Sequence, residues 1–170
     1  MSDVVTVGLA ELKVAENTHV LASFGLGSCV AVALFDPIRK LGGLAHVMLP
    51  ESRGRESDLT PGKFADKAVE RLAEELVEKG ARRRSLQCKI VGGSEMFQII
   101  SAGLRAQKAP AAASGNIGAR IVEAVKRALE QLGIPLAGED TGGNYGRTVR
   151  FEVSTGRVEV SSINHGKIVL

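Results

Sequence analysis

The chain has 170 residues, with 22 basic and 19 acidic side chains and a formal net charge of +3 at pH 7. A chain of this length can bury a core without disulfides, and its two cysteines lack the spacing of a disulfide framework or a zinc site, so we expect a cytoplasmic protein. The absence of tryptophan, the single tyrosine and the shortness of the apolar runs argue against nucleic-acid binding and against membrane insertion.

Short apolar runs in the first fifty residues predict strands over residues 4–9, 19–24, 28–35 and 43–49. The third run shows no alternation of apolar and polar residues, which indicates a strand covered on both faces. Later extended segments are expected at residues 86–91, 134–139, 149–153 and 158–160.

Two amphipathic helices are expected to cover these strands. The first is predicted to be capped by Thr60, to carry Pro61 in its first turn and to end before Gly80. The second runs from about Asn116 to Leu132, and Gly133 follows it.

A short helix from Ser94 to Ile100 and a surface loop over residues 101–115 complete the predicted elements. The sequence contains no internal repeat and no linker. It therefore predicts one α/β domain over residues 1–170, with a mixed, largely antiparallel sheet.

A cysteine and a histidine are the best candidates for chemistry. Cys29 ends the glycine-rich step Gly25–Cys29, and His46 lies in an apolar run 17 residues later. The thiolate is the nucleophilic form of cysteine, and a neighbouring imidazole is its commonest base near neutral pH. The intervening segment Asp36–Lys40 is typical of a turn, so the two flanking strands should form a hairpin.

The register of this hairpin decides whether the two side chains meet. In an antiparallel pair the numbers of opposed residues add up to a constant. A sum of 75 makes Cys29 and His46 direct neighbours, and a sum of 77 places them diagonally on one face. A sum of 76 puts them on opposite faces and ends the catalytic interpretation.

Structural roles are the alternative for both residues. A cysteine in an apolar run is more often a small core side chain, and we assign that role to Cys88. A buried histidine is more often a hydrogen-bonded core residue than a base. If His46 is a base, a third group should orient it; Ser23 and Asp36 are the candidates, and Ser23 is the nearer by position.

Six segments, in order along nearly the whole chain, resemble motifs of the chemoreceptor glutamine deamidases, the CheD family. They are Gly25–Val32, Gly43–Pro50, Pro61–Asp66, Lys89–Phe97, Asn116–Arg120 and Glu139–Asn144. The resemblance implies a single-domain α/β/α sandwich. It also implies hydrolysis of selected glutamine side chains on bacterial chemoreceptors to glutamate, with release of ammonia.

The resemblance also assigns roles to residues of this chain. Cys29 becomes the nucleophile that forms a thioester, His46 the general base and Ser23 the third catalytic residue, where the family carries threonine. No metal or organic cofactor is needed for these steps. Around the nucleophile, the expected substrate rim consists of Gly27, Ser28, Asp140, Thr141 and Asn144.

Two further departures from the family are visible: Ile121 stands where we expect asparagine, and the segment 101–115 is longer than the usual connection. The resemblance implies chemoreceptor cytoplasmic domains as substrate and a CheC-type phosphatase as a further partner. A non-catalytic chemotaxis adaptor is therefore the alternative function. Another cysteine-dependent acyl transferase or protease is a third possibility, although the strands give no sign of an extended peptide groove.

Overall fold

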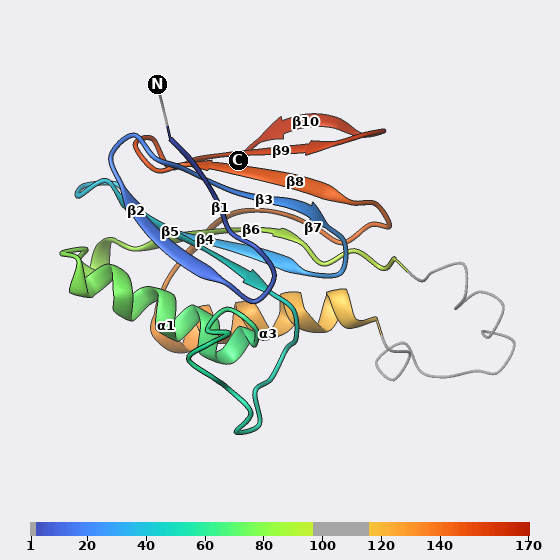
Figure 1. Cartoon of the computed structure of the whole chain (residues 1–170), viewed down its shortest axis with the longest axis horizontal. Coiled ribbons are helices and arrows are strands. Elements are labelled where there is room, and N and C mark those ends of the chain that lie inside the picture. The colour runs from blue at the N-terminus through green and yellow to red at the C-terminus, as the bar shows by residue number, and fades with distance from the viewer. Residues whose placement is uncertain (1–2, 97–115) are drawn as a thin grey trace, which may run out of the picture.

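The computed structural model describes residues 3–96 and 116–170 (Figure 1). The predicted loop 101–115 lies outside the described residues, as does most of the short helix predicted after Ser94. Within the described ranges, no helix is long and apolar enough to cross a membrane.

Among the described residues, ten strands form two five-stranded sheets. The first sheet has the order β1 (Val4–Thr6), β3 (Val20–Leu26), β8 (Arg147–Glu152), β9 (Arg157–Ser162) and β10 (Gly166–Val169). The second has the order β2 (Leu12–Glu16), β5 (Leu41–Val47), β4 (Val30–Asp36), β6 (Gln87–Gly92) and β7 (Leu136–Thr141). Only β1–β3 and β6–β7 are parallel among these neighbours. The predicted α/β class and the mixed, largely antiparallel pairing are confirmed.

Two long helices, α1 (Ala65–Glu78) and α3 (Ile117–Leu132), lie against the second sheet (Figure 1). Their apolar faces form one core with that sheet. The opposite face of the second sheet packs against the first sheet and forms a second core. Over the described residues, the layers are therefore helices, sheet and sheet.

Strand β4 shows why its sequence lacks alternation. The side chains of Val30, Val32 and Leu34 pack toward the helices, whereas those of Ala31 and Phe35 pack toward the first sheet. A strand buried on both faces has no position that favours a polar residue. The predicted cover on both faces is confirmed, with a sheet supplying one of the two covers.

Adjacent glycines on β5 allow both neighbouring layers to approach this strand. A Cβ atom on Gly42 would lie 2.8 Å from the Phe151 ring of the first sheet. A Cβ atom on Gly43 would lie 2.6 Å from Leu72 of α1. The strand that carries His46 therefore sits close to both layers.

The first helix begins later than the sequence predicted. Its N-cap is Phe64, which makes no side-chain capping bond, so the assignment of the cap to Thr60 is wrong. Pro61 and Gly62 instead lie in a turn before the helix, so the placement of Pro61 in its first turn is wrong as well. Gly62 donates its N–H to the Ala10 carbonyl, and Phe64 forms a bridge with Leu49. These contacts compete with helix formation and delay its start.

The predicted end of the first helix and both predicted ends of the second are confirmed. Gly80, with φ +111°, directly follows the C-cap of α1. Asn116 caps α3, because its side-chain oxygen accepts the Ala119 N–H, and Gly133 ends α3 in a left-handed conformation.

Candidate active site

The β4–β5 hairpin has the register that brings Cys29 and His46 to one face. Ala31 lies opposite His46, so opposed residues sum to 77. Cys29 precedes β4 by one residue and packs against the core between the two sheets. His46 faces the same core and is 4% exposed. The two residues are therefore diagonal neighbours on the inter-sheet face.

The hydrogen bonding of His46 fixes its tautomer. Its Nδ1 atom lies 3.3 Å from the carbonyl oxygen of Val7. A carbonyl oxygen only accepts, so Nδ1 must carry the proton of the neutral ring and Nε2 must carry the lone pair. This Nε2 atom is buried and has no hydrogen-bond partner among the described residues. It is the natural proton acceptor of the site.

The carbonyl of Val7 is shared with Ser23. The fully buried Ser23 hydroxyl donates to it at 2.8 Å. Val7 itself is held next to β3, because its N–H donates to the Ala22 carbonyl at 2.7 Å. Ser23 thus supports the acceptor of the His46 bond, rather than bonding to the ring in any interaction of the described residues.

Asp36, the other candidate for a third group, bonds to backbone N–H groups instead of His46. Its carboxylate accepts N–H groups of Ile38 and Arg39 in the hairpin turn and of Arg82 after α1. These bonds lower the pKa of Asp36 against the opposing effect of burial. Asp36 therefore stabilises the turn that sets the register.

Burial dominates the electrostatics of the candidate pair. It raises the pKa of the Cys29 thiol, and the residue's own backbone N–H acts in the opposite direction. Burial also lowers the pKa of His46, against the Val7 carbonyl and the Glu11 carboxylate. A neutral thiol beside a neutral imidazole is thus the favoured state near neutral pH. Cys88 is fully buried, which raises its pKa strongly and leaves it as a core residue.

The loop that carries Cys29 is held by the turn that follows β6. Gly93 donates its N–H to the Cys29 carbonyl at 2.9 Å, and Ser94 donates to the Gly27 carbonyl at 3.0 Å. Gly92 has φ +117°, and a Cβ atom on it would collide with the Cys29 carbonyl oxygen. Only glycine fits at this position without moving the loop.

The remaining predicted rim residues lie around this turn. Gly27 and Ser28 are half-buried beside Cys29. Thr141 and Asn144 line a hollow of about 450 Å³ together with Gly93. Asp140 does not point freely into solvent, because its carboxylate lies 3.0 Å from Nε of the buried Arg147.

Sequence reasoning missed Val7, Ser94 and Arg147. Val7 acts through its backbone, which leaves no trace in residue type. Arg147 did carry a signal: it has the same parity as Val149 and Phe151, so β8 turns it toward the buried face. A basic residue at an inward position needs partners inside the protein.

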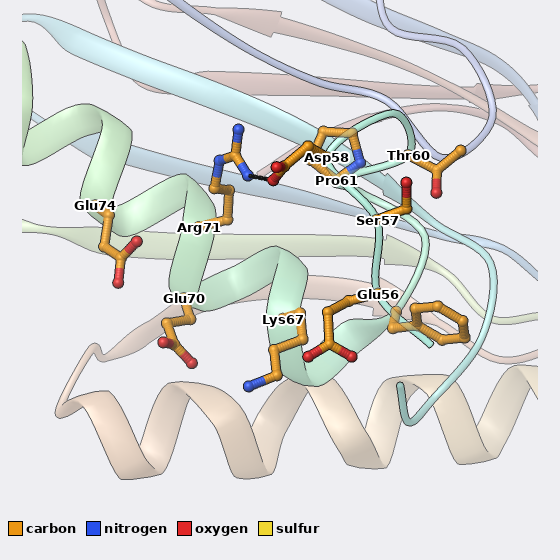
Figure 2. A pocket seen from close by; sticks show the side chains of 10 residues that line it. Glu56, Ser57, Asp58, Thr60, Pro61, Lys67, Glu70, Arg71 and Glu74 are labelled. Carbon is orange, nitrogen blue, oxygen red and sulfur yellow. Dashed lines mark hydrogen bonds and ion pairs between the residues drawn. The ribbon is translucent and has the colours of Figure 1, made fainter. Parts of the chain in front are cut away.

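A separate hollow of about 360 Å³ lies between the segment 56–61 and α1 (Figure 2). Arg71 crosses it to Asp58 at a distance of 2.9 Å. Its lining includes no histidine or cysteine, and none of the predicted site residues. The candidate nucleophile and base therefore lie apart from this hollow, on the inter-sheet face.

Comparison with known proteins identifies the family. A sequence model described as "CheD chemotactic sensory transduction" matches residues 48–162, a segment that begins just after His46. Curated relatives extend the match over the N-terminal strands. The chemoreceptor glutamine deamidase CheD of Thermotoga maritima is 45% identical over 95% of this chain and 93% of its own length.

Other relatives agree. A probable chemoreceptor glutamine deamidase CheD of Caldanaerobacter subterraneus is 43% identical over 97% of this chain and 96% of its own. The chemoreceptor glutamine deamidase CheD of Halalkalibacterium halodurans is 41% identical over 98% of both chains. This chain therefore belongs to the CheD family.

Proposed function

We propose that this protein hydrolyses selected glutamine side chains of bacterial chemoreceptors to glutamate in the cytoplasm, through a thioester on Cys29. The names of its relatives support the reaction and the substrate. The observation that carries the mechanism is the unpartnered lone pair of His46 Nε2 on the face that Cys29 shares.

In the first step, the Cys29 sulfur attacks the carbon of the substrate amide while Nε2 of His46 takes the thiol proton. The raised pKa of Cys29 and the lowered pKa of His46 favour transfer during attack over a stored ion pair. The Val7 carbonyl accepts from Nδ1–H and stabilises the imidazolium that forms. Backbone N–H groups of the Cys29 loop hold the negative charge on the substrate oxygen.

In the second step, the intermediate collapses. The carbon–nitrogen bond breaks, the imidazolium gives its Nε2 proton to the departing nitrogen, and ammonia leaves a thioester behind. Water then attacks the thioester carbon as Nε2 takes its proton. The carbon–sulfur bond breaks, the sulfur regains the proton from His46, and the product is glutamate.

The test uses a purified cytoplasmic receptor fragment and peptide mass spectrometry. Deamidation adds about 1 Da to each modified peptide, and acyl-enzyme chemistry requires the nucleophile. We expect Cys29→Ala to abolish the mass change and Cys88→Ala, the matched control, to preserve it. Deamidation by Cys29→Ala at the rate of the unsubstituted protein would refute the mechanism, and cleavage of the receptor backbone would indicate a protease instead.

An adaptor function is the second candidate, in which the protein binds receptors or a CheC-type phosphatase without catalysis. An exposed basic cluster, Arg82 to Arg84, lies before β6, whereas the Cys29 loop meets the other end of that strand. This separation allows the two functions to be tested independently. If charge reversal of Arg82–Arg84 abolished chemotaxis while Cys29→Ala left it intact, binding would be the main role.

A further inference from the structure

Among the buried charged side chains that the structure describes, Arg147 makes the most hydrogen bonds, and no step of the proposed mechanism uses it. The residue is 2% exposed. Its Nε donates to Asp140 at 3.0 Å, Nη1 donates to the Gly142 carbonyl at 2.8 Å, and Nη2 donates to the Tyr145 hydroxyl at 3.1 Å. Removing a guanidinium from water costs free energy that its hydrogen bonds must offset, so each of these bonds indicates what the residue holds in place.

A further hydrogen bond, to Ser94, connects Arg147 to the loop that carries Cys29. Nη1 also donates to the hydroxyl of Ser94 at 2.8 Å. The same hydroxyl lies 2.7 Å from the Tyr145 carbonyl oxygen and 3.1 Å from the Gly142 carbonyl oxygen. The guanidinium thus joins the turn after β6 to the segment between β7 and β8.

The turn passes this restraint on to the peptide groups around Cys29. The Ser94 N–H holds the Gly27 carbonyl, and the Gly93 N–H holds the Cys29 carbonyl. A trans peptide is planar, so fixing the carbonyl of Gly27 also fixes the direction of the Ser28 N–H. The N–H groups that would bind a substrate oxyanion therefore take their orientation from the turn.

We propose that Arg147 is a positioning residue, which acts through Ser94 and the Gly92–Ser94 turn to hold the Gly27–Cys29 loop in its reactive conformation. Its hydrogen bonds reach none of the atoms that react in the proposed mechanism. The proposal rests on the proposed function where the turnover of a receptor fragment is measured. The alkylation of Cys29 tests it independently of that function. A displacement of about 1 Å in a reacting group can lower a rate by about a hundredfold.

The primary variant is Arg147→Met, which keeps an unbranched side chain as far as the position of Nε and removes every side-chain hydrogen bond. The control is Arg71→Met, the same substitution at a half-exposed arginine, which removes the ion pairs to Asp58 and Glu75 away from the candidate site. Two measurements are made on each protein: kcat and KM for a receptor fragment, and the alkylation rates of Cys29 and Cys88 with iodoacetamide, followed by mass spectrometry.

We expect Arg147→Met to lower kcat about ten- to a hundredfold, with KM changed less than threefold. A released loop should admit water to Cys29, so its alkylation should become faster while turnover falls. Cys88, in the core, should stay protected. General unfolding would instead expose both cysteines together. Arg147→Lys, which keeps the charge, should recover part of kcat.

Two outcomes overturn the proposal: a kcat of Arg147→Met within twofold of the control, or an unchanged rate of Cys29 alkylation. Parallel exposure of Cys29 and Cys88 shows instead that the variant has not folded. If Arg147→Met does not fold, Ser94→Ala decides, because it removes only the hydroxyl link and should shift kcat and Cys29 alkylation in the same directions. If the unsubstituted protein deamidates no receptor, the proposed function fails, while the alkylation comparison still tests the position of the loop.

Discussion

Ser23 and His46 lie on different sheets, yet both hydrogen-bond to one oxygen, the carbonyl of Val7. Ser23 belongs to β3 of the first sheet, and His46 to β5 of the second. The shared acceptor joins the two layers at the point where the candidate base sits. It also leaves Nε2, rather than Nδ1, as the nitrogen that is free to accept a proton.

Substitution of Ser23 should reveal how much this support contributes. Ser23→Ala removes one of the two bonds to the Val7 carbonyl and leaves the carbonyl freer to move. A hydrogen bond of this kind is worth about 1 kcal/mol, so we expect kcat to fall about three- to tenfold. Ser23→Thr keeps the hydroxyl and should retain the activity. The measurement is receptor deamidation at saturating substrate; an Ala variant as active as the Thr variant would argue against the role.

The pH dependence of activity should follow His46. Burial lowers its pKa, so the imidazole keeps its lone pair to a lower pH than the ordinary value of 6.5. The acid limb of kcat/KM is therefore expected below pH 6.5. A limb above pH 7 would indicate a stabilised imidazolium and contradict the neutral pair.

The same shift affects stability in a defined direction. Because the folded state binds the His46 proton less tightly than the unfolded state, stability is fully present above pH 6.5 and is lost as pH falls toward the lowered pKa. As the pH falls from about 7.5 to about 5, across the ordinary histidine pKa of about 6.5, the melting temperature of the unsubstituted protein should fall more steeply than that of His46→Gln. Equal slopes would show that His46 titrates normally.

Alkylation of Cys29 should distinguish proton transfer during attack from a stored ion pair. Burial raises the pKa of this thiol, so its reaction with iodoacetamide should have a midpoint at or above the ordinary thiol value of about 8.5. Cys88 should not react in the folded protein, and both cysteines should react alike after denaturation. A Cys29 midpoint below about pH 7 would require a thiolate–imidazolium pair instead.

Gly92→Ala should damage the site more than the fold. The new methyl group would meet the Cys29 carbonyl oxygen at a backbone φ of +117°, so the loop has to move. We expect deamidation to fall at least about a hundredfold. Gly133→Ala is the control: Gly133 has φ +70° with open space around it, so strain alone, about 1 kcal/mol or more, should lower the melting temperature and spare turnover. Equal turnover in the two variants would contradict this view of the loop.

Much of the fold was predictable because its elements carry strong local patterns. Asn116 and Gly133 delimit α3 as expected, since a side-chain cap and a left-handed glycine depend on neighbouring residues alone. The prediction that Thr60 caps α1 was wrong because the residues after it bond to Ala10 and Leu49, which are remote in sequence. Strand β2 was missed for a similar reason: it is a half-buried edge strand whose pattern is weak.

For the site, the turn at Asp36 limited the register to three values, two of which place Cys29 and His46 on one face. The structure has one of these two. The restraint of the Cys29 loop could not be predicted, because it depends on the pairing of β6 with β4 and on a turn that meets Arg147 from another strand. Such a network is visible only when three distant segments are assembled.

The role of Val7 has a consequence for how relatives of this protein can be compared. Its oxygen belongs to the main chain, so drift in residue type at this position should leave the hydrogen bonds intact. A deletion or insertion within residues 4–7 would shift a different carbonyl into place. We expect a homologue with every catalytic side chain present, but with altered spacing there, to have lost its orientation of the imidazole. For this site, the count of residues matters more than their identity.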